Sequence, residues 1–316
     1  YDIRAIPGKG YGCFAIKPIA AGTRIIAESP LLVVPVAEYY QEDIQAAFDK
    51  LSAADKELYF TLHSAHGQDP KHWPSQIHST VTPREQKRIL EQHNARVGKE
   101  PSLISIFQTN CMEMEDGAAI FPNASRLNHS CNPNACFVWN AAIYKETIHV
   151  MRKVEKGEEI TVSYCDQMHE KTLRAWELKH YGFSCDCPAC AGDETDSSSF
   201  ACMSAERRYR MDELHREVRP YRGKHLEQGA KKERFVENLL NLAVLHMEDG
   251  DHSARLANIF LDIALVSEVN GDLKTAFSAA TKACAVKRNC QGTDFPEYKK
   301  YEAVYQRIAT KKRGQQ

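Results

Sequence analysis

The sequence lacks three features, and each absence excludes a class of protein. No apolar run reaches the ~18 residues that a transmembrane helix needs, because Asn258, Asp262 and Glu268 interrupt the longest candidate, residues 256–269. Neither sign of charge is in excess, since the chain has 41 basic and 42 acidic side chains. No finger spacing of the C₂H₂ type occurs. We therefore expect no membrane association and no direct nucleic-acid binding.

The remaining composition is that of a globular protein large enough to bury a core without disulfide staples. Of the 316 residues, 43% are hydrophobic and 26% are charged. There are eleven cysteines, a number that could indicate disulfides, but such frameworks are typical of short secreted chains. The cysteines cluster tightly at only one place. We therefore expect an intracellular protein, in the nucleus, the cytoplasm or both, with one metal site.

That cluster is Cys185-Asp186-Cys187-Pro188-Ala189-Cys190. Three thiolates at this spacing suit a tetrahedral, structural Zn²⁺ ion, which needs one further ligand. We choose Cys131 as the fourth ligand and keep Cys202 in reserve. The alternative is a group of buried or disulfide-linked cysteines. The other cysteines are more simply read as small core residues.

Hydrophobic patterning divides the chain into segments of different character. Short apolar strands are expected near 13–16, 24–27, 31–34, 137–139, 148–151 and 160–164, with residues 8–12 as a flexible loop. Helical spacing appears at 39–50, 53–63 and 83–97, with Ser52 and Thr82 as caps. Further helices are expected at 167–182, 238–247, 254–269, 273–286 and 296–309, and Gly250 and Gly271 sit where C-caps belong.

Four motifs occur in an order that is far more specific than any one of them. They are Gly8-Lys9-Gly10-Tyr11-Gly12, then Arg126-Leu127-Asn128-His129-Ser130-Cys131-Asn132-Pro133-Asn134, then Gly157-Glu158-Glu159-Ile160 with Ser163-Tyr164, and finally Tyr181-Gly182-Phe183-Ser184 running into the cysteine cluster. This series resembles the SET-domain protein lysine methyltransferases. Within them it most resembles the SMYD group, whose SET domain is split by an insertion. That group carries a MYND zinc finger in the insertion, whereas residues 37–107 contain no cysteine, so MYND-mediated binding is not implied.

The resemblance implies an α+β fold of small SET-type sheets interrupted by a helical insertion. A zinc-binding post-SET knuckle and an all-α, tetratricopeptide-like C-terminal domain would follow, although an ordinary helical bundle fits the tail equally well. The expected units are an N-terminal SET part at 1–36, the helical insertion at 37–107, a C-terminal SET part at 108–168, the post-SET zinc segment at 169–192 and the helical domain at 200–316.

The resemblance also implies S-adenosylmethionine as methyl donor, S-adenosylhomocysteine as product and a protein lysine as acceptor. Tyr164, Tyr181 and Phe183 would form the catalytic wall. The residues implied to bind the donor are Lys9, Gly10, Tyr11, Asn128, His129, Tyr164 and Phe183. Taken alone, Asn128 and His129 could be turn residues, Tyr164 a core aromatic, and Tyr181 and Phe183 packing around zinc.

The implied transfer needs a neutral amine, whereas free lysine has a pKa near 10.4. An apolar channel would lower that pKa. Tyrosine is a poor general base at neutral pH, so we expect Tyr164 to orient the reacting groups. Glu158 and Glu159 point to opposite faces of a strand and cannot act as an acid–base couple. We expect the enzyme to be a monomer and its substrate to be a histone or another protein. The alternative is a catalytically silent SET-fold scaffold.

Overall fold

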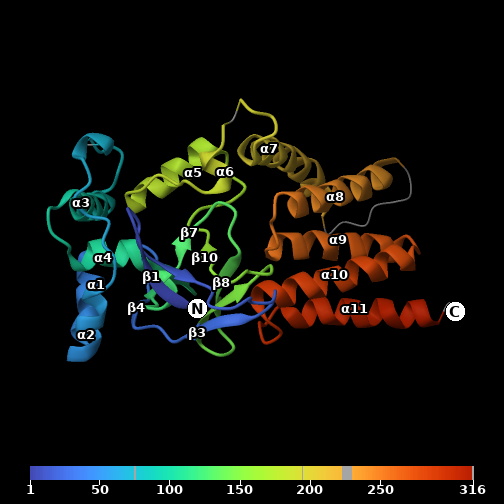
Figure 1. The fold of residues 1–316 in the computed structure, drawn as a ribbon, viewed down its shortest axis with the longest axis horizontal. Coiled ribbons are helices and arrows are strands. Elements are labelled where there is room, and N and C mark those ends of the chain that lie inside the picture. The colour runs from blue at the N-terminus through green and yellow to red at the C-terminus, as the bar shows by residue number, and fades with distance from the viewer. Residues whose placement is uncertain (75, 194, 223–229, 315–316) are drawn as a thin grey trace.

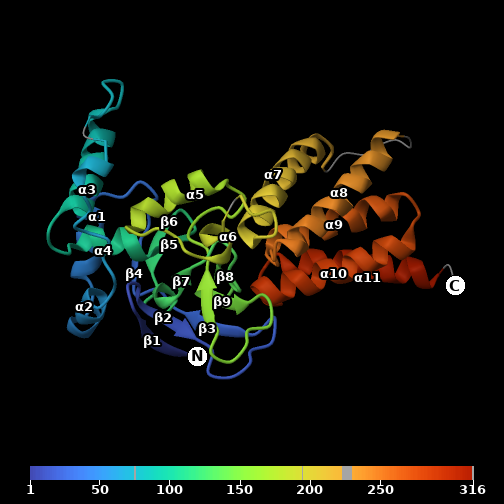
Figure 2. The same ribbon diagram turned by 45° about the horizontal axis from the view of Figure 1, so that its top comes forward.

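The computed structural model describes residues 1–74, 76–193, 195–222 and 230–314. Small sheets lie at the centre, with helices α1 to α4 on one side and α7 to α11 on the other (Figure 1). Helices α5 (Lys171–Leu178) and α6 (Pro188–Ala191) lie between these two groups in both views (Figure 1, Figure 2). No helix in the described ranges is long and apolar enough to cross a membrane.

The first sheet joins strands from the N-terminal residues to strands that follow more than a hundred residues later in the chain. Its strand order is β1 (Asp2–Ile6), β2 (Gly10–Phe14), β10 (Glu159–Val162) and β7 (Asn128–His129). Strands β1 and β2 form an antiparallel hairpin with Ile6 opposite Gly10. The expectation of a flexible loop over residues 8–12 was therefore wrong, because Gly10, Tyr11 and Gly12 belong to β2. Pairing with β1 satisfies the backbone groups of these residues, which the glycine-rich sequence alone would leave free.

The second and third sheets have three strands each. The second has the order β3 (Arg24–Glu28), β9 (Lys145–Val150), β8 (Ala135–Asn140), and the third has the order β4 (Leu32–Val34), β6 (Gly117–Ile120), β5 (Cys111–Met114). The strands expected from apolar runs are confirmed. Strands β5 and β6 were not expected. In β6 the stretch Gly117-Ala118-Ala119 has no β-branched or aromatic residue, so its sequence does not predict a strand.

The insertion is helical and packs on the third sheet. It contains α1 (Gln41–Asp49), α2 (Ala53–Phe60), a 3₁₀ turn at Pro70–His72 and α3 (Pro83–Val97). Helix α4 (Leu103–Asn110) follows and crosses the expected boundary at residue 107. The predicted caps are confirmed, since the hydroxyls of Ser52 and Thr82 accept from the backbone N–H three residues on.

The C-terminal region is entirely helical in its described part. After a 3₁₀ turn at Lys179–Tyr181 come α7 (Phe200–Val218), a 3₁₀ turn at Arg219–Tyr221, α8 (Ala230–Glu248), α9 (Ala254–Val269), α10 (Leu273–Gln291) and α11 (Tyr298–Arg313). Gly250 and Gly271 have φ of 78° and 76°, as the C-cap prediction requires. These helices share one apolar core, and the tetratricopeptide-like arrangement stays a prediction.

Candidate functional site

The site is assembled where β7 and β10 pair in parallel, with Val162 opposite His129. Nδ1 of His129 accepts a hydrogen bond from the backbone N–H of Tyr164 at 2.9 Å. The amide of Asn128 donates to the carbonyl of Tyr11 at 2.9 Å and to Oε1 of Glu159 at 2.8 Å. Three of the four motifs therefore meet through direct hydrogen bonds.

Gly12 shows how closely these motifs approach one another. A Cβ at this position would lie 2.5 Å from Oε1 of Glu159 and 2.9 Å from the amide nitrogen of Asn128. Any side chain would break the bond between them, so the sequence needs glycine here. Glu158 makes a separate set of bonds, accepting from the backbone of Glu155 and the amide of Asn134. The two glutamates thus act as separate structural acceptors.

Four rings gather beside the paired strands. The ring of Tyr164 lies 4.8 Å from that of Tyr181, 6.4 Å from that of Phe183 and 5.4 Å from that of His129, measured between centroids. The rings of Phe183 and His129 are 6.1 Å apart. Residues that lie far apart in sequence therefore form one aromatic wall, as the resemblance implied for Tyr164, Tyr181 and Phe183.

The tyrosines of this wall stay protonated at neutral pH. Burial raises the pKa of Tyr164 above its usual range and that of Tyr181 to about 12. The hydroxyl of Tyr164 donates to the carbonyl of Leu127 at 2.5 Å. The hydroxyl hydrogen of Tyr164 is therefore already donated, whereas the lone pairs of its oxygen can still accept a hydrogen bond. This geometry suits orientation of a reacting group and does not suit proton abstraction.

A cleft of about 550 Å³ opens against this wall, and we call it the aromatic cleft. It includes residues that the sequence did not single out, contributed by the insertion and by α5. Tyr39, Arg96 and Gln108 come from the insertion side, and no motif marks them because they become neighbours only in the fold. The cleft is lined by Tyr39, Arg96, Gln108, Phe137, Ser163, Tyr164, Cys165, Asp166, Trp176, Glu177, His180 and Tyr181.

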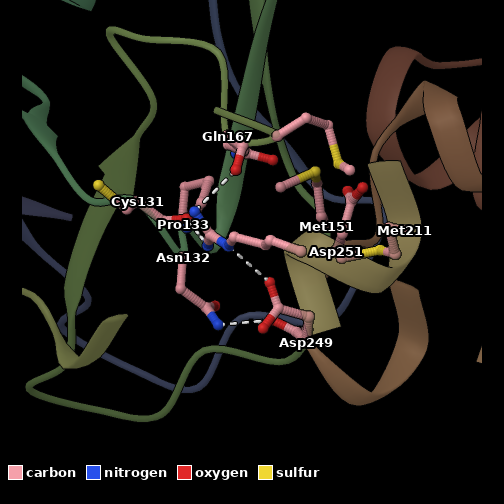
Figure 3. Close-up of a pocket in the computed structure, with 11 residues that line it drawn as sticks. Cys131, Asn132, Pro133, Met151, Gln167, Met211, Asp249 and Asp251 are labelled. Carbon is pink, nitrogen blue, oxygen red and sulfur yellow. Dashed lines mark hydrogen bonds and ion pairs between the residues drawn. The ribbon is translucent and has the colours of Figure 1, made fainter. Parts of the chain in front are cut away.

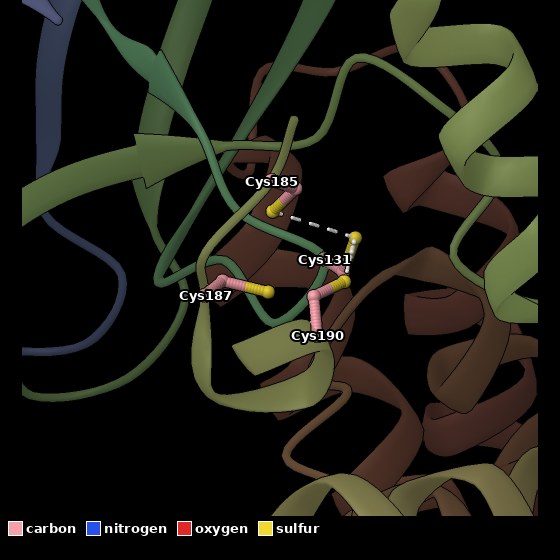
Figure 4. A group of neighbouring side chains, drawn as sticks. All are labelled: Cys131, Cys185, Cys187 and Cys190. Carbon is pink, nitrogen blue, oxygen red and sulfur yellow. Dashed lines mark hydrogen bonds between the residues drawn. The ribbon is translucent and has the colours of Figure 1, made fainter. Parts of the chain in front are cut away.

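The four predicted metal ligands converge on one point. The sulfurs of Cys131, Cys185, Cys187 and Cys190 all lie within 4.8 Å of one another, and Figure 4 shows them facing a common centre. Sγ of Cys131 is 3.5 Å from Sγ of Cys190 and 4.0 Å from Sγ of Cys185. A tetrahedral zinc ion with Zn–S bonds of about 2.3 Å keeps its sulfurs roughly 3.8 Å apart. The geometry fits zinc in the four-cysteine cluster.

The chemistry around Cys131 also fits a thiolate ligand. Arg174 is 3% exposed and donates from Nε to Sγ of Cys131 at 3.2 Å. Nε2 of His129 lies 3.2 Å from the same sulfur. Because Nδ1 of His129 accepts a bond, its Nε2 carries the proton and donates. Two N–H donors on one sulfur favour the anionic form. Sequence reasoning missed Arg174, which no motif marks.

The disulfide alternative and the reserve ligand Cys202 are not supported. All eleven cysteines lie in described residues and all are free, so the disulfide alternative is wrong. Cys202 is outside the four-cysteine cluster. The ammonium of Lys9 bonds to Asp186 at 2.5 Å. That bond ties the β1–β2 hairpin to the cysteine segment.

The helical domain is fastened to the site through Arg208 of α7, which is 4% exposed. Its guanidinium donates to the carbonyls of Cys131 and Gln167 at 2.7 Å each and to Oδ2 of Asp249 at 3.0 Å. The amide of Asn132 donates to the carbonyl of Asp249 at 2.7 Å (Figure 3). The loop that carries a metal ligand is thus held from both sides.

Comparison with known proteins agrees with this geometry. The family model of the SET domain matches residues 10–165. The chain is 30% identical over 196 residues to the histone-lysine N-methyltransferase set5 of Schizosaccharomyces pombe, which covers 61% of this chain and 51% of that protein. It is 35% identical over 89 residues to the histone-lysine N-methyltransferase SMYD3 of Mus musculus, which covers 28% of this chain and 20% of that protein.

The chain thus spans about half the length of the first relative and a fifth of the second. The solved structure of Rubisco LSMT bound to AdoMet aligns over 98% of this chain and 87% of its own, at 14% identity and a TM-score of 0.38, a likeness too distant to bear on function. The family match shows that the chain carries a SET domain over residues 10–165, and the named relatives support a SMYD-like member of the SET-domain family.

Proposed function

We propose that this protein transfers a methyl group from S-adenosylmethionine to a lysine side chain of a histone or another protein. The observation that carries the proposal is the aromatic wall of Tyr164, Tyr181 and Phe183, in which the two tyrosines line the cleft and the backbone of Tyr164 bonds to His129. The relatives named above are histone-lysine methyltransferases, which supports the same substrate class.

The chain's residues would align the reacting atoms and exclude water. In-line displacement requires nucleophile and methyl carbon within about 3–3.5 Å. Tyr181 and Phe183 would flank the lysine stem, and their faces attract the methylated ammonium product. Burial between them disfavours a charged amine and so lowers its pKa. Tyr164, with its hydrogen bound to Leu127, would offer an oxygen acceptor to the methyl hydrogens.

The methyl donor would lie against the β1–β2 hairpin and β7. The side chains of Asn128 and His129 are already engaged with Tyr11 and Tyr164. They would therefore hold the donor mainly through their backbone groups, with Lys9, Gly10 and Tyr11 doing the same opposite them. Phe183, 39% exposed, would cover it. S-adenosylmethionine supplies the sulfonium methyl, which leaves S-adenosylhomocysteine.

Zinc would have a structural role. Cys131, Cys185, Cys187 and Cys190 would hold it with all four positions taken, so no site is left for substrate. The ion would fix the segment that contains Tyr181 and Phe183. The division into SET parts, insertion, post-SET segment and helical domain belongs to the same proposal, together with a monomeric state and action in the nucleus, the cytoplasm or both.

Substitution of Tyr164 by Phe tests the proposal. We expect kcat to fall by about 100-fold or more, the cost of losing one preorganised polar contact in a site of this type. Isothermal calorimetry should show unchanged donor binding, and radiolabelled methyl transfer to a protein array should measure the loss. Tyr209→Phe, in a side chain 66% exposed on α7, is the control. Unchanged turnover in Tyr164→Phe would refute the assigned role, and donor binding without transfer by the native protein would favour a silent scaffold.

A further inference from the structure

A fifth cysteine lies beside the four-cysteine cluster. Sγ of Cys165 is within 4.8 Å of Sγ of Cys131 and of a ring nitrogen of His129. A tetrahedral zinc ion takes four ligands, so Cys165 is surplus to the metal site. It directly follows Tyr164 in the chain. Cys165 is therefore next to the aromatic wall in sequence and close to the proposed metal ligand Cys131 in space.

A second metal does not explain this sulfur. The trio of His129, Cys131 and Cys165 would need Nε2 of His129 as a ligand. That nitrogen carries the ring proton, because Nδ1 accepts from the backbone of Tyr164 at 2.9 Å. Binding a cation there would cost the bond that positions Tyr164. Arg174 also donates to the Cys131 sulfur at 3.2 Å, which places a positive charge beside the trio.

The two sulfurs differ in their access to solvent. Cys165 is partly exposed and lines the aromatic cleft, which is about 550 Å³ and holds small molecules easily. Cys131 is 1% exposed. A small oxidant that enters the cleft therefore meets Cys165 before it meets any buried ligand of the four-cysteine cluster.

We propose that Cys165 is an oxidation site whose product is a disulfide with Cys131. A peroxide oxidises the thiol of Cys165 to a sulfenic acid and is itself reduced to water or an alcohol. The thiolate of Cys131 then attacks the Cys165 sulfur, the S–S bond forms and hydroxide leaves. The sulfur of Cys131 supplies the electron pair for this bond, so Cys131 would no longer be available as a ligand of a zinc ion held by the cluster.

The consequence would be that Cys185, Cys187 and Cys190 alone remain to hold the zinc ion. The peptide around Cys131 is held by Arg208, through the carbonyl of Cys131 at 2.7 Å, so the helical domain stays attached. The segment of Cys185, Cys187 and Cys190 loses its link to β7. Loss of methyl transfer on oxidation rests on the proposed function, whereas the disulfide and the zinc release do not.

The test uses the full chain, purified under reducing conditions and analysed for zinc. Hydrogen peroxide is added, released zinc is followed with a chromogenic chelator, and disulfides are mapped by mass spectrometry without reduction. We expect one zinc ion to be released and a mass lower by about 2 Da, the two hydrogens lost on forming the S–S bond. The bond should map to Cys131 and Cys165, and a thiol reductant with added zinc should reverse both changes.

Cys165→Ser should release zinc more slowly than the native chain and form no such bond. Cys284→Ser, in a half-buried cysteine of α10, is the matched control and should behave like the native protein. Equal zinc release from Cys165→Ser, or disulfides confined to Cys185, Cys187 and Cys190, would overturn the proposal. Where Cys165→Ser fails to fold, the map of the native chain decides. A purified protein without zinc would refute the metal site alone.

Discussion

Arg174 offers the sharpest test of the four-cysteine cluster. The guanidinium is almost fully buried and donates from Nε to Sγ of Cys131 at 3.2 Å. It also donates to the carbonyl of His169 at 2.5 Å and approaches Sγ of Cys190 at 3.7 Å. Four thiolates around Zn²⁺ leave about two negative charges. Arg174 is placed to neutralise part of this charge where water cannot.

The expected magnitude follows from these contacts. Removing one partner of a buried charged pair costs about 3–5 kcal/mol, because the other charge stays buried and unpaired. Arg174→Met should lower the unfolding free energy of the zinc-bound protein by about that amount. If about 3 kcal/mol of this loss appears in the free energy of zinc binding, zinc binds roughly 100-fold more weakly. Arg174→Lys keeps the charge but cannot reach two sulfurs and a carbonyl together, so its loss should be smaller.

The assay is competition for zinc against a chromogenic chelator, read together with urea unfolding. Arg210→Met is the control, because Arg210 is 53% exposed and makes one bond to Glu213, an arrangement worth about 0–1 kcal/mol. A zinc dissociation constant within about twofold of native in a folded Arg174→Met variant would refute charge compensation, since twofold is only about 0.4 kcal/mol. If the Met variant fails to fold, the comparison rests on Arg174→Lys.

Three further perturbations test other parts of the structure. Glu146 is fully buried, and this burial raises its pKa from 4.5 to about 8; because the folded state binds the extra proton, stability should fall as pH rises between these values. Glu146→Gln should flatten a slope of at most about 1.4 kcal/mol per pH unit in urea unfolding, and an unchanged slope would contradict the assignment. Arg208→Met should destabilise the junction with the helical domain by about 3–5 kcal/mol and speed hydrogen exchange in α7, whereas native exchange would show that Arg208 is dispensable. Removal of zinc by a chelator should abolish methyl transfer through lost geometry, and full activity in a zinc-free protein would contradict that coupling.

Local signals in the sequence predicted local structure well. The caps at Ser52 and Thr82 and the C-caps at Gly250 and Gly271 are confirmed, because a cap depends on residues within one turn of it. The apolar runs that became β3, β4, β8 and β9 are confirmed for a similar reason. Each carries its own β-branched or aromatic residues and needs only a partner.

Signals failed where a partner strand decides the conformation. Residues 10–12 belong to strand β2 because they pair with β1, and a glycine-rich stretch carries no signal of that pairing. Strand β6 is likewise held between β4 and β5. Helix α4 crosses the expected end of the insertion at residue 107, since its apolar face packs with both the insertion and the third sheet.

The sequence alone determined the order of the motifs, the family they resemble and the spacing of Cys185, Cys187 and Cys190, because each is a property of neighbouring residues. The sequence also proposed Cys131 as the fourth ligand, but only the tertiary structure brought its sulfur to the other three. The tertiary structure also placed Arg174 and Cys165 beside Cys131, at separations of 43 and 34 residues along the chain. Such contacts depend on how the three sheets and the cysteine-containing segment pack against one another. No local pattern records that closure, which is why the charge partner and the surplus thiol emerged only from the fold.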